Sequence, residues 1–314
     1  MTDISAFPAQ AASASDYIAL LKPRVMSLVV FTGIVGYLCA PGAGDIVLGF
    51  SAILALAVGA GASGALNMWY DSDIDARMAR TASRPVPSGR VSREEALGLG
   101  VTLSVLSVLT MILAAGLFAA ALLAFTIFFY AVVYTMWLKR STPQNIVIGG
   151  LSGALPPAIA WAAKTGGLAL DPVILVAIIF MWTPPHFWAL ALTQSRDYRN
   201  AGVPMLPVTD GAKSTRLHIL AYSLILAPLA CAPLATGLGG PLYAVVSIAG
   251  GIAFVALAVR VAFSKAGDLA EGGEVYAAKA ENKSALHLFI FSIFYLTALF
   301  AALLIERIAG AVLG

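Results

Sequence analysis

Long apolar runs, separated by short segments rich in Gly and Pro, restrict the fold of this sequence more than any other feature. A helix that spans the hydrocarbon core of a membrane needs about 20 mostly apolar residues. The sequence has about nine such runs, at roughly 25–41, 48–69, 96–116, 118–138, 145–163, 172–193, 217–236, 240–261 and 285–305. It therefore predicts an all-α, polytopic membrane protein with about nine transmembrane helices.

The composition excludes a water-soluble globular protein. Hydrophobic residues make up 60% of the 314 residues, charged residues make up 11%, and the mean hydropathy is +0.89. A soluble domain is about 45–50% apolar and about 25% charged. A single core of this size cannot bury the excess, so we expect the lipid bilayer as a partner and no nucleic acid.

The basic residues predict an orientation. If the N-terminus is cytoplasmic, every Lys and Arg except Lys164 and Arg307 falls on the cytoplasmic side, as the positive-inside rule requires. Ahead of the first span, Asp16–Arg24 is typical of a short amphipathic helix at the membrane interface, with a flexible tail as the alternative. We therefore predict a cytoplasmic tail with an interfacial helix over 1–24 and a single transmembrane domain over 25–314.

The first polar motif follows the second apolar run. Asn67, Asp71 and Asp75 are spaced i, i+4, i+8, which places them on one face of a helix, whereas Asp73 points roughly the other way. Carboxylate and amide oxygens suit Mg²⁺, which binds through one or two carboxylates together with substrate phosphates. A solvated helix end, or a carboxylate that lines an ion path, is the alternative reading.

Basic residues lie close to this motif. Arg80 and Arg84 suit a diphosphate, which arginine binds in a bidentate manner, although they also fit a purely topogenic role. Lys139 and Arg140 end the fourth run on the same side of the membrane, and the same two readings apply to them. These cations make a diphosphate the expected ligand beside the aspartates.

A second polar motif follows the sixth run. His186, Thr193 and Asp197 are spaced i, i+7, i+11, so they share a face if one helix continues from Pro185. A histidine in an apolar helix can be a metal ligand, a base or a satisfied core residue, and spacing alone favours the core. Asp197 is the candidate for a second carboxylate on the magnesium side.

Together, these residues resemble the intramembrane aromatic prenyltransferase superfamily, typified by 4-hydroxybenzoate polyprenyltransferase. The aspartate motif is specific to that superfamily. Pro185-His186-Phe187-Trp188 and Gly202-Val203-Pro204-Met205-Leu206-Pro207 resemble the branch that farnesylates protohaem. The resemblance spans about residues 16–305, nearly the whole chain.

The resemblance implies helices around a central cavity, with Mg²⁺ and diphosphate between the two polar loops at the cytoplasmic face of the cell inner membrane. It implies transfer of the farnesyl group of farnesyl diphosphate to a vinyl group of protohaem IX (haem B), with addition of water, giving haem O and diphosphate. The catalytic residues it implies are Asp71, Asp75, Lys139 and Asp197, with Asn67, Asp71, Asp75 and Asp197 as metal ligands. The substrate-binding residues it implies are Asn67, Arg80, Arg84, Tyr134, Arg140, His186, Arg196 and Tyr198.

The sequence departs from many relatives in its second motif, where Asp197 stands without further closely spaced aspartates. This leaves the second magnesium shell open. Haem-modifying or oxidase-assembly proteins are expected partners from the resemblance alone. A quinone precursor or chlorophyllide as acceptor, a transporter and a non-catalytic assembly factor are the alternatives. The motif acids lie at span ends among arginines, which favours phosphate binding over a transport path.

Overall fold

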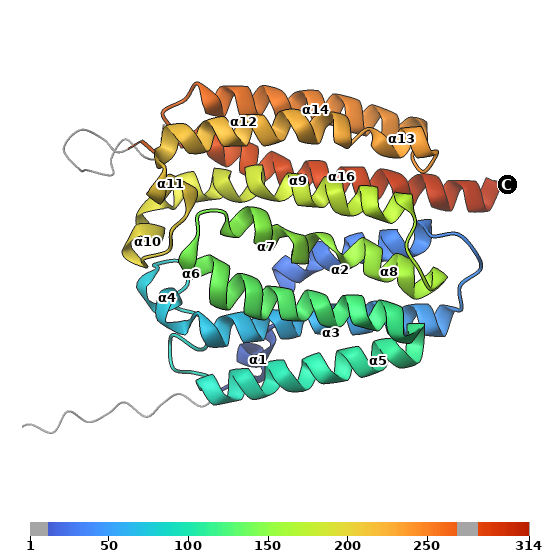
Figure 1. Ribbon diagram of the computed structural model, residues 1–314, viewed down its shortest axis with the longest axis horizontal. Helices are drawn as coiled ribbons and strands as arrows, with labels where there is room; N and C mark the ends of the chain where they lie inside the picture. The colour runs from blue at the N-terminus through green and yellow to red at the C-terminus, as the bar shows by residue number, and fades with distance from the viewer. Residues whose placement is uncertain (1–11, 269–281, 314) are drawn as a thin grey trace, which may run out of the picture.

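The computed structural model describes residues 12–268 and 282–313, which form helices joined by turns, so the predicted all-α class is confirmed. Figure 1 shows the long helices lying side by side along one common axis. The helices are α1 (Ala14–Leu20), α2 (Pro23–Cys39), α3 (Ile46–Tyr70), α4 (Ser72–Arg77), α5 (Arg93–Phe128), the π-helix η1 (Phe129–Leu138), α6 (Lys139–Ser141), α7 (Asn145–Ala154), α8 (Pro156–Thr165), α9 (Leu170–Thr193), α10 (Ser195–Asn200), α11 (Leu206–Thr209), α12 (Gly211–Leu229), α13 (Ala232–Thr236), α14 (Pro241–Ala262) and α16 (Lys283–Leu313).

The short helices α4, α6, α10 and α11 gather at one end of the bundle, on the left of Figure 1, and we call this end the polar end. It carries both polar motifs identified in the sequence. An apolar cluster holds the two motif segments together, because Ile74 of α4 packs with Tyr198 of α10, Met205 before α11 and Ile146 of α7. The polar end is therefore built from parts of the chain that lie far apart in sequence.

The membrane-spanning character is confirmed by helix length and composition. Among the described residues, seven helices are long and apolar enough to cross a membrane, or eight if the bent pair of α1 and α2, which meet at 52°, forms one span. One of these seven is the 49-residue stretch Arg93–Ser141, which is interrupted at Gly116. The total of nine spans and the cytoplasmic N-terminus remain predictions.

The chain doubles back within α5. A Cβ built on Gly100 would lie 2.7 Å from Leu66 of α3, and Asn67, the next residue of α3, donates a hydrogen bond to Thr135 at 3.1 Å. A straight helix would hold residues 100 and 135 roughly 50 Å apart. The reversal occurs at Gly116, whose φ of 83° and ψ of −179° suit glycine and few other residues. The helix before Gly116 and the helix after it, which continues into η1, therefore both lie against α3.

The second motif is not carried by one continuous helix, so the condition on which His186 and Asp197 would share a face is not met. The helix α9 runs through Pro184 and Pro185 but ends at Thr193, and Gln194 leaves the helical region with φ of −120°. The separate helix α10 then carries Asp197. This break turns the end of the motif away from the axis of α9.

Two side-chain hydrogen bonds hold the helix α1 against the start of α5 and the loop before it. The Asp16 carboxylate accepts a hydrogen bond from Arg90 at 2.8 Å, and the Tyr17 hydroxyl donates to Glu95 at 2.9 Å. Hydrogen bonds from Ser13 and Arg90 lower the pKa of Asp16 to about 2, so this carboxylate stays ionised throughout the physiological range. The interfacial location of α1 remains a prediction, as does the division between 1–24 and 25–314.

Lys164 and Arg307 both bind the C-terminal end of α2. They are the two basic residues that the sequence predicts on the non-cytoplasmic side. Lys164 donates to the carbonyl of Ala40 at 2.8 Å, and Arg307 donates to that of Leu38 at 3.1 Å. The last carbonyls of a helix lack partners within it, and cations there also favour the helix dipole. Both residues therefore have a structural role at the end of a helix.

The crossing of α2 and α8 depends on the absence of a side chain at Gly36. A Cβ at this position would lie 2.4 Å from the carbonyl oxygen of Pro157, which is backbone and cannot move aside cheaply. We expect Gly36→Ala to destabilise the fold by about 1–3 kcal/mol, as overpacking does. Gly98 on α5 has nothing within 4 Å, and Gly98→Ala should be neutral or stabilising by up to about 1 kcal/mol. Thermal unfolding midpoints in detergent would compare the two variants, and equal midpoints would contradict this expectation.

Candidate functional site

The core of the candidate site is the carboxylate of Asp71 at the junction of α3 and α4. Asp71 is fully buried. Its Oδ2 accepts a hydrogen bond from Asn67 Nδ2 at 2.7 Å and forms an ion pair with Lys139. The spacing i, i+4 brings Asn67 and Asp71 together, as predicted. A buried carboxylate needs such partners, because an unpaired charge in this environment would be very costly.

The second aspartate of the motif has its own cation. Asp75 is also buried, and its Oδ2 accepts from Arg84 Nη1 at 2.7 Å. Thr81 ties the intervening loop down by donating to the carbonyl oxygen of Asp75 at 2.9 Å. The loop that carries the arginines therefore folds back onto the motif that precedes it.

Asp73 is exposed, unlike this buried pair, but it shares the Arg140 guanidinium with Asp71. Its side chain is 47% exposed and accepts two hydrogen bonds from Arg140, at 2.7 and 2.9 Å. The Arg140 guanidinium also lies 4.6 Å from the centre of the Tyr70 ring and 3.6 Å from Asp71 Oδ1. The hydrogen bonds from Arg140 lower the pKa of Asp73. Arg140 therefore contacts both sides of the motif.

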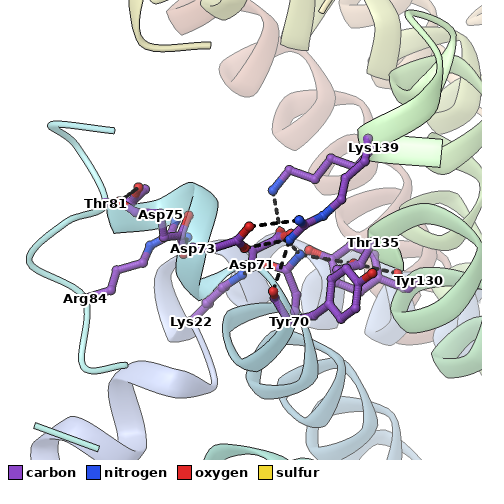
Figure 2. A network of polar contacts seen from close by, with 12 residues as sticks. Lys22, Tyr70, Asp71, Asp73, Asp75, Thr81, Arg84, Tyr130, Thr135 and Lys139 are labelled. Carbon is purple, nitrogen blue, oxygen red and sulfur yellow. Dashed lines mark hydrogen bonds and ion pairs between the residues drawn. The ribbon is translucent and has the colours of Figure 1, made fainter. Parts of the chain in front are cut away.

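The π-helix η1 carries Thr135, and Lys139 is the first residue after it, at the start of α6. Both side chains reach the end of α3 (Figure 2). The Thr135 hydroxyl accepts from Asn67 Nδ2 at 3.1 Å and donates to the carbonyl of Tyr130, five residues earlier, at 2.8 Å. π-Helices are rare and often occur at functional sites. Nothing in the hydrophobic pattern of the fourth apolar run predicts it.

Lys22 also belongs to the site, although it was not among the site residues predicted from the sequence. Its ammonium group donates to Asn67 Oδ1. Lys22 is also the one non-glycine residue with positive φ among the described residues, at 51°, immediately before Pro23. Such a backbone conformation costs energy and is often retained at functional sites. The only sequence signal was the presence of a cation beside a proline ahead of the first span.

The residues present fit Mg²⁺ in part. Asp71 Oδ1 is buried without a hydrogen-bond partner among the described residues, as expected of an atom that faces a cation or ligand. However, Asn67 Oδ1 is occupied by Lys22, and no group of three or more His, Cys, Asp or Glu within residues 12–268 and 282–313 could enclose a metal. The arrangement therefore suits a metal that is completed by substrate phosphates and water.

The second polar loop lies beside the first. Burial raises the pKa of Tyr198 on α10, and the charges of nearby Arg80 and Arg84 oppose this rise. Asp197 is partly buried, whereas Arg196 is exposed. The structure thus brings Tyr198 close to the arginines of the first motif, while the roles of Asp197 and Arg196 remain predictions.

His186 lies in the core of the bundle, between the rings of Trp182 and Phe289, at 4.2 and 4.6 Å between ring centres. Its Nδ1 is 2.6 Å from the hydroxyl of Ser292, which donates its single proton to the carbonyl of Phe289. With that proton on the carbonyl, Nδ1 of the imidazole is the donor, and Nε2 of the neutral ring then has a lone pair. In metal-binding histidines, a hydrogen bond donated by the other ring nitrogen selects this same tautomer.

Comparisons with known proteins agree with this geometry. Residues 29–272 match the model of the UbiA prenyltransferase family. The chain is 60% identical to the protoheme IX farnesyltransferase of Maricaulis maris, over 96% of this chain and 92% of that one. It is also 60% identical to the protoheme IX farnesyltransferase of Caulobacter vibrioides, over 94% and 91% of the two chains.

Two solved structures share the fold. A digeranylgeranylglyceryl phosphate synthase superposes with a TM-score of 0.73 at 17% identity, covering 94% of this chain and 98% of that one. A UbiA homolog from Archaeoglobus fulgidus bound to DMAPP and Mg²⁺ superposes with a TM-score of 0.62 at 16% identity, covering 92% and 99%. At these identities the likeness is one of fold.

Proposed function

This chain belongs to the UbiA prenyltransferase family, and from that membership we propose that it transfers the farnesyl group of farnesyl diphosphate to a vinyl group of protohaem IX (haem B). Water is added in the same reaction, and the products are haem O and diphosphate. The observation that carries the proposal is the 60% identity to protoheme IX farnesyltransferases over nearly the full chain. The buried carboxylates and cations of the polar end supply the expected chemistry.

The diphosphate of the substrate would bind among Lys139, Arg84 and Arg140. In the structure these cations are paired with aspartates. When Mg²⁺ is bound by Asp71 and Asp75, it supplies positive charge that stabilises the leaving diphosphate. The cations released from the aspartates would then contact the phosphate oxygens, where the negative charge of the leaving group develops. Arg80, Tyr134, Tyr198, Arg196 and Asp197 are proposed to complete this binding region from the neighbouring loop and helix.

The haem would lie deeper, where His186 Nε2 carries its lone pair. The imidazole is positioned by Ser292 and by the rings stacked on it, so it is suited to contact the haem face or its iron. We place the reaction at the cytoplasmic face of the cell inner membrane, which matches the basic loops of the polar end. Haem-modifying or oxidase-assembly proteins would receive the product.

The test is to supply membranes containing the protein with haem B, farnesyl diphosphate and Mg²⁺, and to analyse the haem by mass spectrometry. The expected product is haem that has gained a farnesyl group and one water, and it should disappear when EDTA removes Mg²⁺. Diphosphate release with an aromatic acceptor but not with haem would overturn the haem assignment and retain prenyl transfer. No reaction with either acceptor, in protein shown to be folded, would overturn both.

A further inference from the structure

Asn145, the first residue of α7, has a buried oxygen that nothing in the site described so far explains. The residue is fully buried, and its Nδ2 donates to the carbonyl of Thr142 at 2.6 Å. Its Oδ1 has no hydrogen-bond partner among the described residues. Exchanging the two amide atoms would bring two oxygens within 2.6 Å, so the orientation of the amide is determined by its surroundings. A buried acceptor is left over, and such an atom requires an explanation.

The neighbours of Asn145 belong to the candidate site. Gly149 lies four residues later on the same face of α7, and a Cβ there would be 2.2 Å from the ring of Tyr134, so this ring lies against that face. The next residue, Ile146, belongs to the apolar cluster that also contains Ile74 of the first motif and Tyr198 of the second. Asn145 therefore lies beside residues that join the two polar loops.

We propose that Asn145 Oδ1 holds the water molecule that is added to the substrate, an inference that rests on the proposed function. Oδ1 can only accept a hydrogen bond or face a cation. Among the proposed reactants, the farnesyl chain has no donor, and the diphosphate and ionised haem propionates are acceptors. Water is the reactant that has a proton to donate. No acid or histidine cluster within the described residues indicates a metal at this position.

The proposed role concerns the last step of the reaction. The C–O bond of farnesyl diphosphate breaks, and its electron pair leaves with the diphosphate. The electron pair of the vinyl group forms a bond to the freed farnesyl carbon, which leaves a cation on the vinyl carbon next to the ring. An oxygen lone pair of water bonds to that carbon, and one water proton passes to the departed diphosphate. Without a positioned water, the cation instead loses a proton from carbon and gives a dehydrated adduct.

The experiment measures the ratio of hydrated to dehydrated farnesyl haem in two variants. Asn145→Leu removes the acceptor, and this ratio should fall about tenfold, the effect of losing one hydrogen bond to a reacting molecule. Asn145→Asp keeps the size of the side chain and an acceptor oxygen, and its buried carboxyl in the protonated form can donate to the Thr142 carbonyl, so its ratio should stay close to that of the wild-type protein. If the Leu variant does not fold, Asn145→Ala removes the same acceptor.

The outcomes separate this proposal from the proposed function and from a structural role. A Leu variant with the wild-type ratio, whatever its rate, would overturn the role of Asn145 and leave haem farnesylation intact. An equal fall in the Leu and Asp variants would also overturn it, because an acceptor oxygen at this position would then not be sufficient. Wild-type protein that forms no farnesylated haem would instead contradict the proposed function itself.

Discussion

Replacing Asp71 by Asn is expected to lower the rate of prenyl transfer by about a thousandfold or more. The amide keeps the size of the side chain, so the protein should still insert and fold. It removes the negative charge toward which Lys139 and Arg140 converge, and replaces a carboxylate whose Oδ1 accepts no hydrogen bond from the described residues and lies 3.6 Å from Arg140. The measurement is the rate of farnesyl-haem formation at saturating Mg²⁺.

Asp73 offers a matched control on the same turn of the chain. It binds Arg140 through two hydrogen bonds, but its side chain is 47% exposed, so its charge is largely solvated. We expect Asp73→Asn to reduce the rate by less than about tenfold, as for exposed ion pairs. Equal losses in both variants would show that the rate depends on the pairing of Arg140 and not on the buried carboxylate.

Replacing Lys139 by Met is expected to affect stability and activity together. The change leaves the fully buried Asp71 without its closest cation, which should destabilise the fold by about 3–5 kcal/mol. It also removes a charge proposed to stabilise the leaving diphosphate, so the rate should fall by about a hundredfold or more. Thermal unfolding in detergent and farnesyl-haem formation measure the two effects.

The double variant with Lys139→Met and Asp71→Asn separates these effects. Removing both charges should restore most of the stability, because no uncompensated charge remains buried, while activity should stay lost. Lys139→Arg keeps the charge and should keep most of the stability. A double variant no more stable than Lys139→Met would mean that the ion pair is not what holds these two segments together.

Much of the fold could be predicted because apolar runs of spanning length have few alternatives in a membrane. The boundary predicted between 96–116 and 118–138 coincides with the reversal at Gly116. The pattern of Asn67 and Asp71 also predicted their contact. By contrast, the break of α9 at Gln194 depends on the packing of the loop that follows it, which no local pattern records.

The sequence predicted that basic residues would line the site, but it did not predict which groups they bind. Lys139 was expected to bind phosphate, and in the structure it binds Asp71. Lys22 was missed because its reach to Asn67 depends on a strained backbone angle and on the bend between α1 and α2. Contacts between residues this far apart in sequence arise from tertiary packing, so a single sequence does not reveal them.

The π-helix η1 lets the site tolerate a kind of mutation that an ordinary α-helix would not. A π-turn holds more residues than an α-turn, so deleting one residue from Phe129–Leu138 would let that turn relax to ordinary α-helix. The segment would stay as apolar as before and still long enough to cross a bilayer. The relaxed turn would cover about the same angle with one residue fewer, so the side chains beyond the deletion would keep their direction. Lys139 would still face the end of α3. A single-codon deletion in this helix is therefore expected to be less damaging than one in α3, where the side chains beyond the deletion would rotate by about 100° relative to those before it.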